Sequence, residues 1–186
     1  MKSPQTNETS KVSYLQKALV AGTISAFMFM AVASTDVEET SAPPETSEQI
    51  AMETTAPCGN VEVKITKVSS RSQVGDMEFG TKASEGGILV VVEWSYKNIS
   101  KKPISMFDGP SMTLVSEDGT TYDADVDATS SYATETESDE KVVSDLNPGI
   151  TVKGAEVFEV SEELFDASKW SIKVESDETT CWFKMQ

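Results

Sequence analysis

The sequence contains no histidine, and this absence excludes several classes of chemistry. Ser-His-Asp and Cys-His nucleophile systems, zinc sites with histidine ligands and pH switches based on an imidazole all require that residue. The chain also has only two cysteines, too few for a four-thiolate metal site, and they do not form the C-x-x-C motif of redox-active pairs. Any catalysis would depend on carboxylates, lysine, tyrosine or a hard metal ion. We expect a protein that is not an enzyme and needs no cofactor.

Basic residues are scarce. The 186 residues include 15 Lys and Arg against 31 Asp and Glu, a formal net charge of −16. Three lysines and one glutamate lie in residues 1–33, so the rest of the chain has 12 basic and 30 acidic residues and a charge of −18. Nucleic acids and anionic lipids would be repelled, so we expect no nucleic-acid partner and no membrane contact by the domain itself. Such acidity favours a soluble, self-repelling and monomeric protein.

Residues 1–33 have the order of a secretory signal. Three lysines precede an uncharged stretch, 18–33, which ends in Ala-Val-Ala before Ser34. We interpret this segment as a signal peptide cleaved between Ala33 and Ser34. The alternative is an uncleaved membrane anchor, although the stretch is shorter than the ~20 residues that span a bilayer. Either interpretation predicts an extracytoplasmic domain, secreted or in the cell envelope, and membrane-tethered if the signal is retained.

Residues 34–57 contain six acidic residues, three prolines and no basic residue. Such a segment buries too little apolar surface to offset its ordering entropy, so we predict a disordered acidic linker. It is either a spacer or a solvated tail left after signal removal. The folded domain is then expected to comprise residues 58–186.

Residues 88–98, I-L-V-V-V-E-W-S-Y-K-N, are the strongest strand signal. Alternate residues from Ile88 to Tyr96 are large and apolar, as on the buried face of a strand. On the other face, Leu89 and Val91 are apolar and polar residues follow. The pattern predicts a central strand with one face buried throughout and the other buried only at its start.

Shorter runs with the same period lie on both sides of this strand. Turn signals separate them, among them Asp118-Gly119 and Asn147-Pro148-Gly149. No helical run of ten residues intervenes, so the sequence predicts an all-β fold, an antiparallel β-sandwich of about seven or eight strands. Two segments are polar: residues 69–87 are expected to form a long loop or an irregular edge, and residues 127–141 are expected to form a second mobile loop.

An ordered set of motifs resembles a known family. The motifs are I-L-V-V-V-E-W-S-Y-K-N-I-S, K-K-P-I-S, M-T-L-V-S-E-D-G-T-T-Y-D-A-D and L-N-P-G-I-T-V-K-G-A-E-V-F-E-V-S-E, within residues 59–175. They resemble the bacterial domain-of-unknown-function 4352 family, whose domains are immunoglobulin-like β-sandwiches of the immunoprotective extracellular kind. The resemblance implies an exported domain without an established enzymatic activity and transfers no catalytic residues. Many relatives have a lipid-modified cysteine directly after the signal, where this chain has Ser34, so lipid anchoring is not expected.

Cys58 lies just before the first predicted strand and Cys181 lies in the last one. Export would allow them to oxidise, and a disulfide would tie the two ends of the domain together. Closing a loop of ~120 residues would remove about 4–5 kcal/mol of entropy from the unfolded chain on the chain-entropy model. The alternative is two separate buried thiols.

Asp123, Asp125 and Asp127 have D-x-D-x-D spacing, as in a calcium loop. An EF-hand would require Gly after the third Asp and Glu at the twelfth position, where this chain has Ala128 and Thr134. On a strand this spacing would place all three carboxylates on one face, either as a solvated surface or as weak candidate calcium ligands.

Four aromatic residues are candidates for a carbohydrate or peptide groove. Trp94 and Trp170 fall on the buried phase of strands and are expected in the core with Tyr96 nearby, whereas Trp182 is the expected exposed aromatic. The segment 98–100, Asn-Ile-Ser, has the pattern of a glycosylation acceptor, but we interpret it as a turn.

These observations predict an exported, non-catalytic binding or accessory domain. Such sandwiches bind through end loops or an exposed sheet edge, so 69–87 and 127–141 are the candidate contact segments. The negative charge favours a protein partner, unidentified, with a basic surface. One alternative is a calcium-dependent envelope module that uses the three aspartates. Another is a carboxylate-based hydrolase, for which no pair of acidic residues stands out.

Overall fold

The computed structural model describes residues 48–76, 78, 80–136 and 144–186. The predicted signal segment, its cleavage site between Ala33 and Ser34, and the linker as far as residue 47 lie outside the described residues. Within the described part of the chain, no helix is long and apolar enough to cross a membrane.

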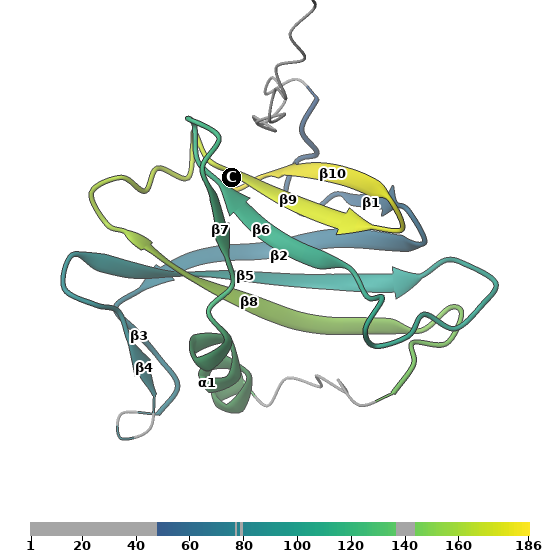
Figure 1. Cartoon of the computed structure of the whole chain (residues 1–186), viewed down its shortest axis with the longest axis horizontal. Helices are drawn as coiled ribbons and strands as arrows, with labels where there is room; N and C mark the ends of the chain where they lie inside the picture. Colours follow the sequence, from purple (N-terminus) through teal and green to yellow (C-terminus); the bar gives the residue numbers. More distant parts are fainter. Residues whose placement is uncertain (1–47, 77, 79, 137–143) are drawn as a thin grey trace, which may run out of the picture. The chain divides into compact units, whose positions relative to one another are not determined.

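Two four-stranded antiparallel sheets face each other (Figure 1). The first has the order β1 (Thr55–Cys58), β2 (Val61–Arg71), β5 (Gly87–Asn98) and β8 (Thr151–Ser161). The second has the order β10 (Thr179–Lys184), β9 (Ser171–Ser176), β6 (Ser111–Val115) and β7 (Thr121–Asp123). A hairpin of β3 (Gln73–Val74) and β4 (Thr81–Lys82) and the helix α1 (Val126–Thr136) are the other described elements. The predicted immunoglobulin-like antiparallel β-sandwich is confirmed.

β5 is the central strand that the sequence predicted. It pairs with β2 on one side and with β8 on the other. On its inner face Val90, Val92 and Trp94 are buried between the sheets. On its outer face Leu89 and Val91 are wholly buried, and the later residues of that face are partly exposed. The prediction for the outer face is therefore confirmed, whereas the inner face is buried from Val90 to Trp94 and only partly buried at Ile88 and Tyr96.

The main core fills the space between the two sheets. Trp94 and Trp170 are each 4% exposed, as predicted for core residues. Trp182 is half-buried on the edge strand β10, and the most exposed large apolar side chain described is instead Phe107, at 88%. The largest wholly buried side chains of this core are Phe158, Phe183, Ile65, Leu114 and Ile172.

Cys58 and Cys181 form a disulfide, as the sequence predicted, with their Cα atoms 5.9 Å apart. Cys58 ends β1 and Cys181 lies in β10, so the bond joins an edge strand of one sheet to an edge strand of the other. One edge of the sandwich is therefore closed covalently. The opposite edge, formed by β8 and β7, has no such link, because the chain has only two cysteines.

The helix α1 is the main difference from the prediction. Residues 127–141 were expected to form a mobile loop, but 127–136 belong to this 11-residue helix, and 137–141 lie outside the described residues. The expectation that no helical run of ten residues intervenes between the strands is therefore also wrong. Figure 1 shows α1 on the outer side of the first sheet, so that the first sheet lies between α1 and the second sheet.

Local chemistry explains why this polar segment is helical. Asp125 immediately precedes α1, and its Oδ1 accepts a hydrogen bond of 2.8 Å from the backbone N–H of Ala128, which is an N-cap interaction. Ala128 and Tyr132 are one turn apart, and both are buried in a small second core with Leu89 and Val91 of β5. The apolar start of the outer face of β5 is thus covered by two residues of an otherwise polar helix.

The sandwich begins before Cys58. Ile50 exchanges backbone hydrogen bonds of 2.8 Å with Trp182 and Lys184, and β1 pairs with β2 from Thr55 onwards. The last residues of the predicted linker, 34–57, therefore overlap the folded domain.

The predicted loop 69–87 is also partly strand, because β2 continues to Arg71 and the β3–β4 hairpin follows. Two of its residues, 77 and 79, lie outside the described residues.

Candidate binding cleft

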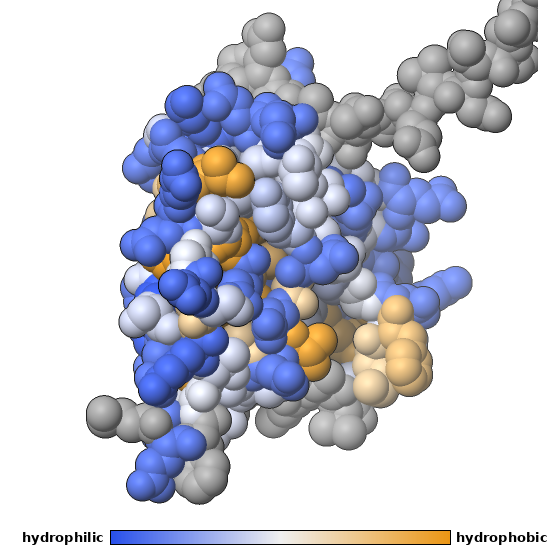
Figure 2. All heavy atoms as spheres, turned by 60° about the vertical axis from the view of Figure 1, so that its left-hand side comes forward, coloured by the Kyte–Doolittle hydropathy of each residue, from blue (hydrophilic) through white to orange (hydrophobic). Residues whose placement is uncertain are grey.

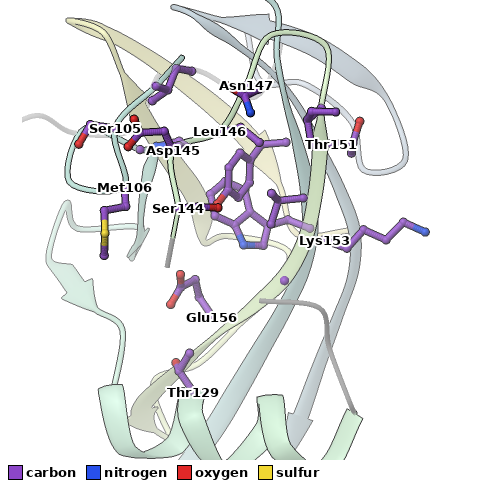
Figure 3. A pocket seen from close by; sticks show the side chains of 18 residues that line it. Ser105, Met106, Thr129, Ser144, Asp145, Leu146, Asn147, Thr151, Lys153 and Glu156 are labelled. Atoms are coloured by element: carbon purple, nitrogen blue, oxygen red, sulfur yellow. The ribbon is translucent and has the colours of Figure 1, made fainter. Parts of the chain in front are cut away.

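A cleft of about 710 Å³ opens at the edge of the sandwich where β8 begins (Figure 3). One wall is the first half of β8. The others come from residues 104–110, which connect β5 to β6, and from residues 144–147, which precede β8. Pockets of about 300–1,000 Å³ are typical of sites for small ligands and peptide side chains.

Asn98, the last residue of β5, fixes the two connections beside the cleft. Its side chain is wholly buried, and its Nδ2 donates hydrogen bonds to the carbonyl oxygens of Lys102 and Leu146, at 2.8 and 2.7 Å. Its Oδ1 accepts hydrogen bonds from the backbone N–H and the hydroxyl of Ser100. The predicted turn at residues 98–100 is confirmed, and an amide buried in this way is not accessible to a glycan-transferring enzyme.

The predicted turn at Asn147-Pro148-Gly149 is also present. The backbone N–H of Ile150 donates to the carbonyl of Asn147 at 3.1 Å, and Gly149 has a φ of +77°. Ile104 and Leu146 pair through two backbone hydrogen bonds of 3.0 and 2.8 Å. These contacts hold residues 104 and 146 side by side and define the end of the cleft.

Gly154 opens the cleft floor. This residue lies within β8 directly opposite Trp94 of β5, on the face that points towards the second sheet. Because glycine has no side chain, β8 itself does not cover Trp94 at this position, but the surrounding core does, since Trp94 is 4% exposed. The ring of Tyr96 lies 4.8 Å from that of Trp94, centroid to centroid, and both residues line the cleft. A glycine inside a strand often marks a place where a ligand or another backbone approaches closely.

Apolar side chains form part of the rim. Met106 is 44% exposed and Ile150 is 53% exposed, and both line the cleft. Figure 3 shows Met106 and Ser105 on the wall opposite β8. An aromatic floor with an apolar rim suits the non-polar part of a ligand.

Two carboxylates supply the negative charge of the cleft. Figure 3 places Glu156 at one end, near Thr129 of α1, and Asp145 at the other end beside Leu146. The side chain of Lys153 projects away from the cleft in the same view. The lining therefore favours a cationic ligand over an anionic one.

β8 is an edge strand, and its outer edge is only partly covered. The carbonyl of Val157 accepts a hydrogen bond of 2.7 Å from the N–H of Asp125, and its N–H donates to Thr129 Oγ1 at 3.0 Å. Closer to the start of the strand, the peptide groups of Lys153 and Ala155 face outwards in the same way. Within the described residues these peptide groups form no hydrogen bond, and of the two residues Lys153 is exposed whereas Ala155 is buried in the second core.

A second hollow lies at the other end of the sandwich, between residues 116–118 and 163–170. Its aromatic residues pack on one another, because Trp170 stacks on Tyr122 and meets Phe165 edge to face. Figure 2 brings this end forward and shows a mostly hydrophilic surface with small, separate hydrophobic patches. Ser116 and Ser168 bond within their own turns, so this hollow offers fewer groups to a ligand than the first.

The three aspartates of the D-x-D-x-D motif do not share a strand face. Asp123 ends β7, Asp125 caps α1, and Asp127 lies in the first turn of the helix. The prediction of a common face is wrong because the strand ends at Asp123 and the helix begins three residues later. Among the described residues, no group of three His, Cys, Asp or Glu side chains is placed to hold a metal ion.

Charged residues on the outer face of the first sheet hold α1 in place through hydrogen bonds and an ion pair. The hydroxyl of Tyr132 donates to Glu93 Oε1 at 2.8 Å, and Lys67 Nζ donates to the same oxygen at 2.9 Å. Arg71, the single arginine of the chain, pairs with Glu135 at 2.7 Å and lies 5.1 Å from the ring centroid of Tyr132. Each charge of this network has a partner of opposite sign.

Several shifted pKa values belong to this network, and others, such as the lowered pKa of Asp118 beside Ser116, belong to turns at the other end of the sandwich. Burial, together with the hydrogen bond to Glu93, raises the pKa of Tyr132 to about 12. Burial would also raise the pKa of Glu93, but the hydrogen bonds from Lys67 and Tyr132 outweigh it and lower that pKa. The pKa of Glu135 is lowered mainly by the hydrogen bond that it accepts from the backbone N–H of Gly75, and in second place by the hydrogen bond from Arg71. Ion-pair networks that hold elements together shift pKa values without catalysis.

Sequence reasoning located some of these residues and missed others. Of the predicted contact segments, 127–141 reaches the cleft through Thr129, and 69–87 does not line it. The cleft itself was missed, although Gly154 inside the predicted strand that begins at Thr151 was a usable signal.

Comparison with known proteins agrees with the architecture. The sequence matches the family described as a domain of unknown function, DUF4352, over residues 50–177. The chain belongs to this family. An uncharacterized protein of Bacillus subtilis (strain 168), YxkC, is 50% identical over 117 residues, which are 62% of this chain and 65% of YxkC. The chain thus spans slightly less than two thirds of that relative.

Solved structures show the same fold as this DUF4352 domain. The crystal structure of a conserved hypothetical protein from Bacillus anthracis is similar with a TM-score of 0.62 and 30% identity, covering 72% of this chain and 94% of that one. The yjhA protein of Bacillus subtilis is similar with a TM-score of 0.50 and 12% identity, covering 73% of this chain and 98% of that one. The latter likeness concerns the fold alone.

Proposed function

We propose that this DUF4352 protein is an exported, non-catalytic binding domain that holds its ligand in the cleft beside β8. The observation that supports this most is a cleft of about 710 Å³ beside the edge strand β8, whose lining includes the partly exposed Tyr96 and the exposed side chains of Met106 and Ile150. Pockets of this size and lining commonly hold small ligands or side chains of other proteins.

The chemistry of the cleft favours binding over catalysis. The chain lacks histidine, and the two cleft carboxylates, Asp145 and Glu156, lie at opposite ends of the lining (Figure 3). The pKa values of Glu93 and Arg71 of the first sheet and of Tyr132 of α1 are shifted, and these groups lie on the outer side of that sheet and do not line the cleft. A carboxylate hydrolase would need two carboxyls facing one another across the substrate.

Three features support export. They are the signal-like segment 1–33, the strongly acidic remainder of the chain, and the disulfide between Cys58 and Cys181. Disulfides persist mainly in oxidising compartments outside the cytoplasm. The intact mass of the protein from its own host, alkylated without reduction, tests this. We expect a chain that begins at Ser34 and carries no alkyl group, whereas a full-length mass with two alkylated thiols would contradict export.

Binding at the cleft is tested by NMR with the exported protein, labelled with ¹⁵N. Pools of small probes would be added, including amino-acid amides, short peptides and sugars. We expect shifts of the Trp94 indole N–H and the Gly154 amide, with the Trp170 indole N–H as the internal control at the other end of the sandwich. If no probe moves the first two signals, or if probes move only Trp170, the proposed function is wrong.

A further inference from the structure

Exposed apolar side chains gather at the end of the sandwich where β5 finishes and β8 begins. Six large apolar side chains are exposed among the described residues, and four of them lie at this end: Ile99, Met106, Phe107 and Ile150. We call these four residues the apolar end. Figure 1 shows the connection from β5 to β6, which carries Phe107, beside the segment that leads into β8. A concentration of exposed apolar side chains on a small domain marks an interaction surface.

Hydrogen bonds around Asn98 hold the apolar end together. The N–H of Asn98 donates to the carbonyl of Ile150 at 3.1 Å, and Ile99 follows Asn98 directly. The buried side chain of Asn98 also binds the carbonyl of Lys102, at the start of the connection to β6. Met106 of that connection and Ile150 both line the cleft. The apolar side chains are therefore carried by loops whose backbones are fixed to one another.

Lysines without an ion pair lie at the same end. Six lysines of the described residues form no salt bridge, and four of them are here: Lys97, Lys101, Lys102 and Lys153. Residues 97–110 and 144–153 together contain these four lysines and two aspartates, Asp108 and Asp145, which gives a net charge of +2. The whole chain has a charge of −16. This end is thus locally positive on a strongly acidic protein.

The local charge decides what can approach this end closely. At physiological salt, charges more than ~8 Å from a surface contribute little to its attraction or repulsion. The acidic turn between β9 and β10, at Asp177 and Glu178, belongs to the edge that the disulfide closes, across the sandwich from β8. The overall charge of the chain predicts repulsion from anionic lipids, but the charge that meets a surface at the apolar end is positive.

The chemistry of this end suits the boundary of a lipid bilayer. Exposed Phe and Met side chains gain free energy when they leave water for the acyl chains. Lysines beside them can reach anionic headgroups with their ammonium groups while their aliphatic stems stay in apolar surroundings. Phe107 is 88% exposed and lines neither the cleft nor the second hollow, so it offers an anchor to a soft surface.

We propose that the apolar end, with Lys101 and Lys102 beside it, docks the domain onto a lipid surface that contains anionic headgroups, and that Phe107 and Met106 insert at the acyl boundary. This inference goes beyond the proposed function, because it concerns the surface around the cleft and not the ligand within it. The cleft, whose lining includes Met106, then lies next to the lipid surface.

Flotation with lipid vesicles tests the proposal on the exported protein. One set of vesicles is pure phosphatidylcholine, and the other is an equimolar mixture of phosphatidylcholine and anionic phosphatidylglycerol. We expect binding to the anionic vesicles to be at least about fivefold stronger than to the neutral ones, and to weaken as salt is added. Absence of binding to the anionic vesicles, or equal binding to both kinds, would overturn the proposal.

Phe107→Ser tests the apolar contact. Because this side chain is 88% exposed, its removal leaves the core intact, and we expect binding to the anionic vesicles to fall by about tenfold or more. The matched control is Leu164→Ser, which removes a side chain that is 65% exposed at the other end of the sandwich. Equal effects of the two variants, or no effect of Phe107→Ser, would show that the apolar end is not the docking surface.

Two double variants with the same net charge test the lysines. One combines Lys101→Gln with Lys102→Gln, and the other combines Lys82→Gln with Lys184→Gln, at the two remaining described lysines without a salt bridge. We expect the first to lose at least about tenfold in binding to the anionic vesicles and the second to change little. Equal losses would mean that total charge, and not this end, controls binding.

A second copy of the chain is the other occupant that these experiments distinguish. Sedimentation without lipid measures self-association of the parent protein and of Phe107→Ser, and we expect both to be monomers. A dimer of the parent that Phe107→Ser separates would show that the apolar end joins two copies, and would overturn the lipid assignment.

Failure of this proposal can be told apart from failure of the proposed function. Phe107→Ser is expected to leave the shifts of Trp94 and Gly154 with the cleft probes unchanged, since Phe107 does not line the cleft. If those shifts occur but no vesicle binds, the lipid proposal is wrong and the binding cleft stands. If vesicles bind through Phe107 but no probe moves the cleft signals, only the cleft proposal is wrong.

Discussion

The two faces of β5 are built by different means. The inner face packs against the second sheet in a core that contains eighteen of the buried residues described, whereas the outer face shares a core of seven with α1. Buried apolar area dominates the first. The second is small, so it depends in addition on the polar bonds of Tyr132, Glu93, Arg71 and Glu135. One strand thus has an apolar interface on one side and a mixed interface on the other.

This contrast has a consequence for stability. Removal of a buried apolar side chain is expected to lower the free energy of unfolding most on the inner face. The two sheets hold the surrounding atoms there, so these atoms cannot move in to fill the cavity. On the outer face a single helix can move towards the sheet and fill part of the space. The following substitutions measure that difference, in order of decreasing effect.

Leu114→Ala removes a wholly buried side chain of β6 from the inner core. We expect the free energy of unfolding to fall by about 3–5 kcal/mol, because the loss of transfer energy is joined by an unfilled cavity. Urea denaturation followed by tryptophan fluorescence measures the change. A loss below that of the outer-face substitution described below would contradict the comparison.

Replacement of both Cys58 and Cys181 by alanine removes the covalent link at one edge of the inner core. We expect a loss of about 2–4 kcal/mol, because the unfolded chain regains the entropy of a long loop. Hydrogen exchange should accelerate first in β1 and β10, while the amides of α1 stay protected to the same extent relative to global unfolding. Selective loss of protection in α1 would show that the two faces are not independent.

Leu89→Ala is the matched substitution on the outer face, because Leu89 is as fully buried as Leu114. We expect a loss of about 2–3 kcal/mol, near the lower limit for such changes, since α1 can settle onto the sheet. Hydrogen exchange should show faster opening of α1 than of β6. An equal cost for the two leucines would mean that the helix is held as rigidly as a sheet.

Tyr132→Phe keeps the ring in the second core and removes only the hydroxyl that bonds to Glu93. We expect a loss of about 1 kcal/mol at neutral pH, because Glu93 keeps its bond to Lys67. Thermal denaturation of the two proteins gives the difference.

The alkaline part of the curve of stability against pH provides the control for Tyr132→Phe. The pKa of Tyr132 in the folded protein, about 12, lies above the value of about 10 for an unfolded tyrosine. The contribution of this group is therefore complete below pH ~10 and is lost as the pH rises from ~10 towards ~12. Tyr132→Phe should lack this part of the decline, and an unchanged alkaline limb would contradict the assignment.

Glu135→Gln is expected to have the smallest effect. The pKa of Glu135 is lowered by Gly75 and Arg71, so its contribution is present above the unfolded value of about 4.3 and is lost as the pH falls through the folded value. The variant should show a shallower loss of stability in acid than the parent protein, with little change at pH 7. Urea midpoints between neutral and acidic pH measure this slope.

The sequence located the inner face and the disulfide because each depends on a simple pattern. Val90, Val92 and Trp94 alternate strictly, and the two cysteines, one near each end of the folded domain, have one pairing available. The outer face was only half predicted. Leu89 and Val91 indicated that something covers the start of that face, but the cover has just Ala128 and Tyr132 as buried residues, and periodicity alone cannot detect such a helix.

The cleft could not be derived from local pattern. Asn98 signals a turn, yet its bond to the carbonyl of Leu146, 48 residues away, exists only once β5 and the start of β8 lie side by side. Gly154 signals an interruption of side chains, but its position opposite Trp94 depends on the register between two strands. Register is a property of the assembled sheet, so the site follows from the fold and not from the motif.

The bond between Cys58 and Cys181 also determines how the domain would respond to mechanical force. A pull on the N-terminal side of Cys58 and on the end of the chain is transmitted from β1 directly to β10 through the two sulfur atoms. The chain between the two cysteines, which are 123 positions apart and enclose the cleft strand and α1, then carries none of the load. Only the residues before Cys58 and those after Cys181 can lengthen, so a domain stretched between its two ends would keep its ligand site intact under tension.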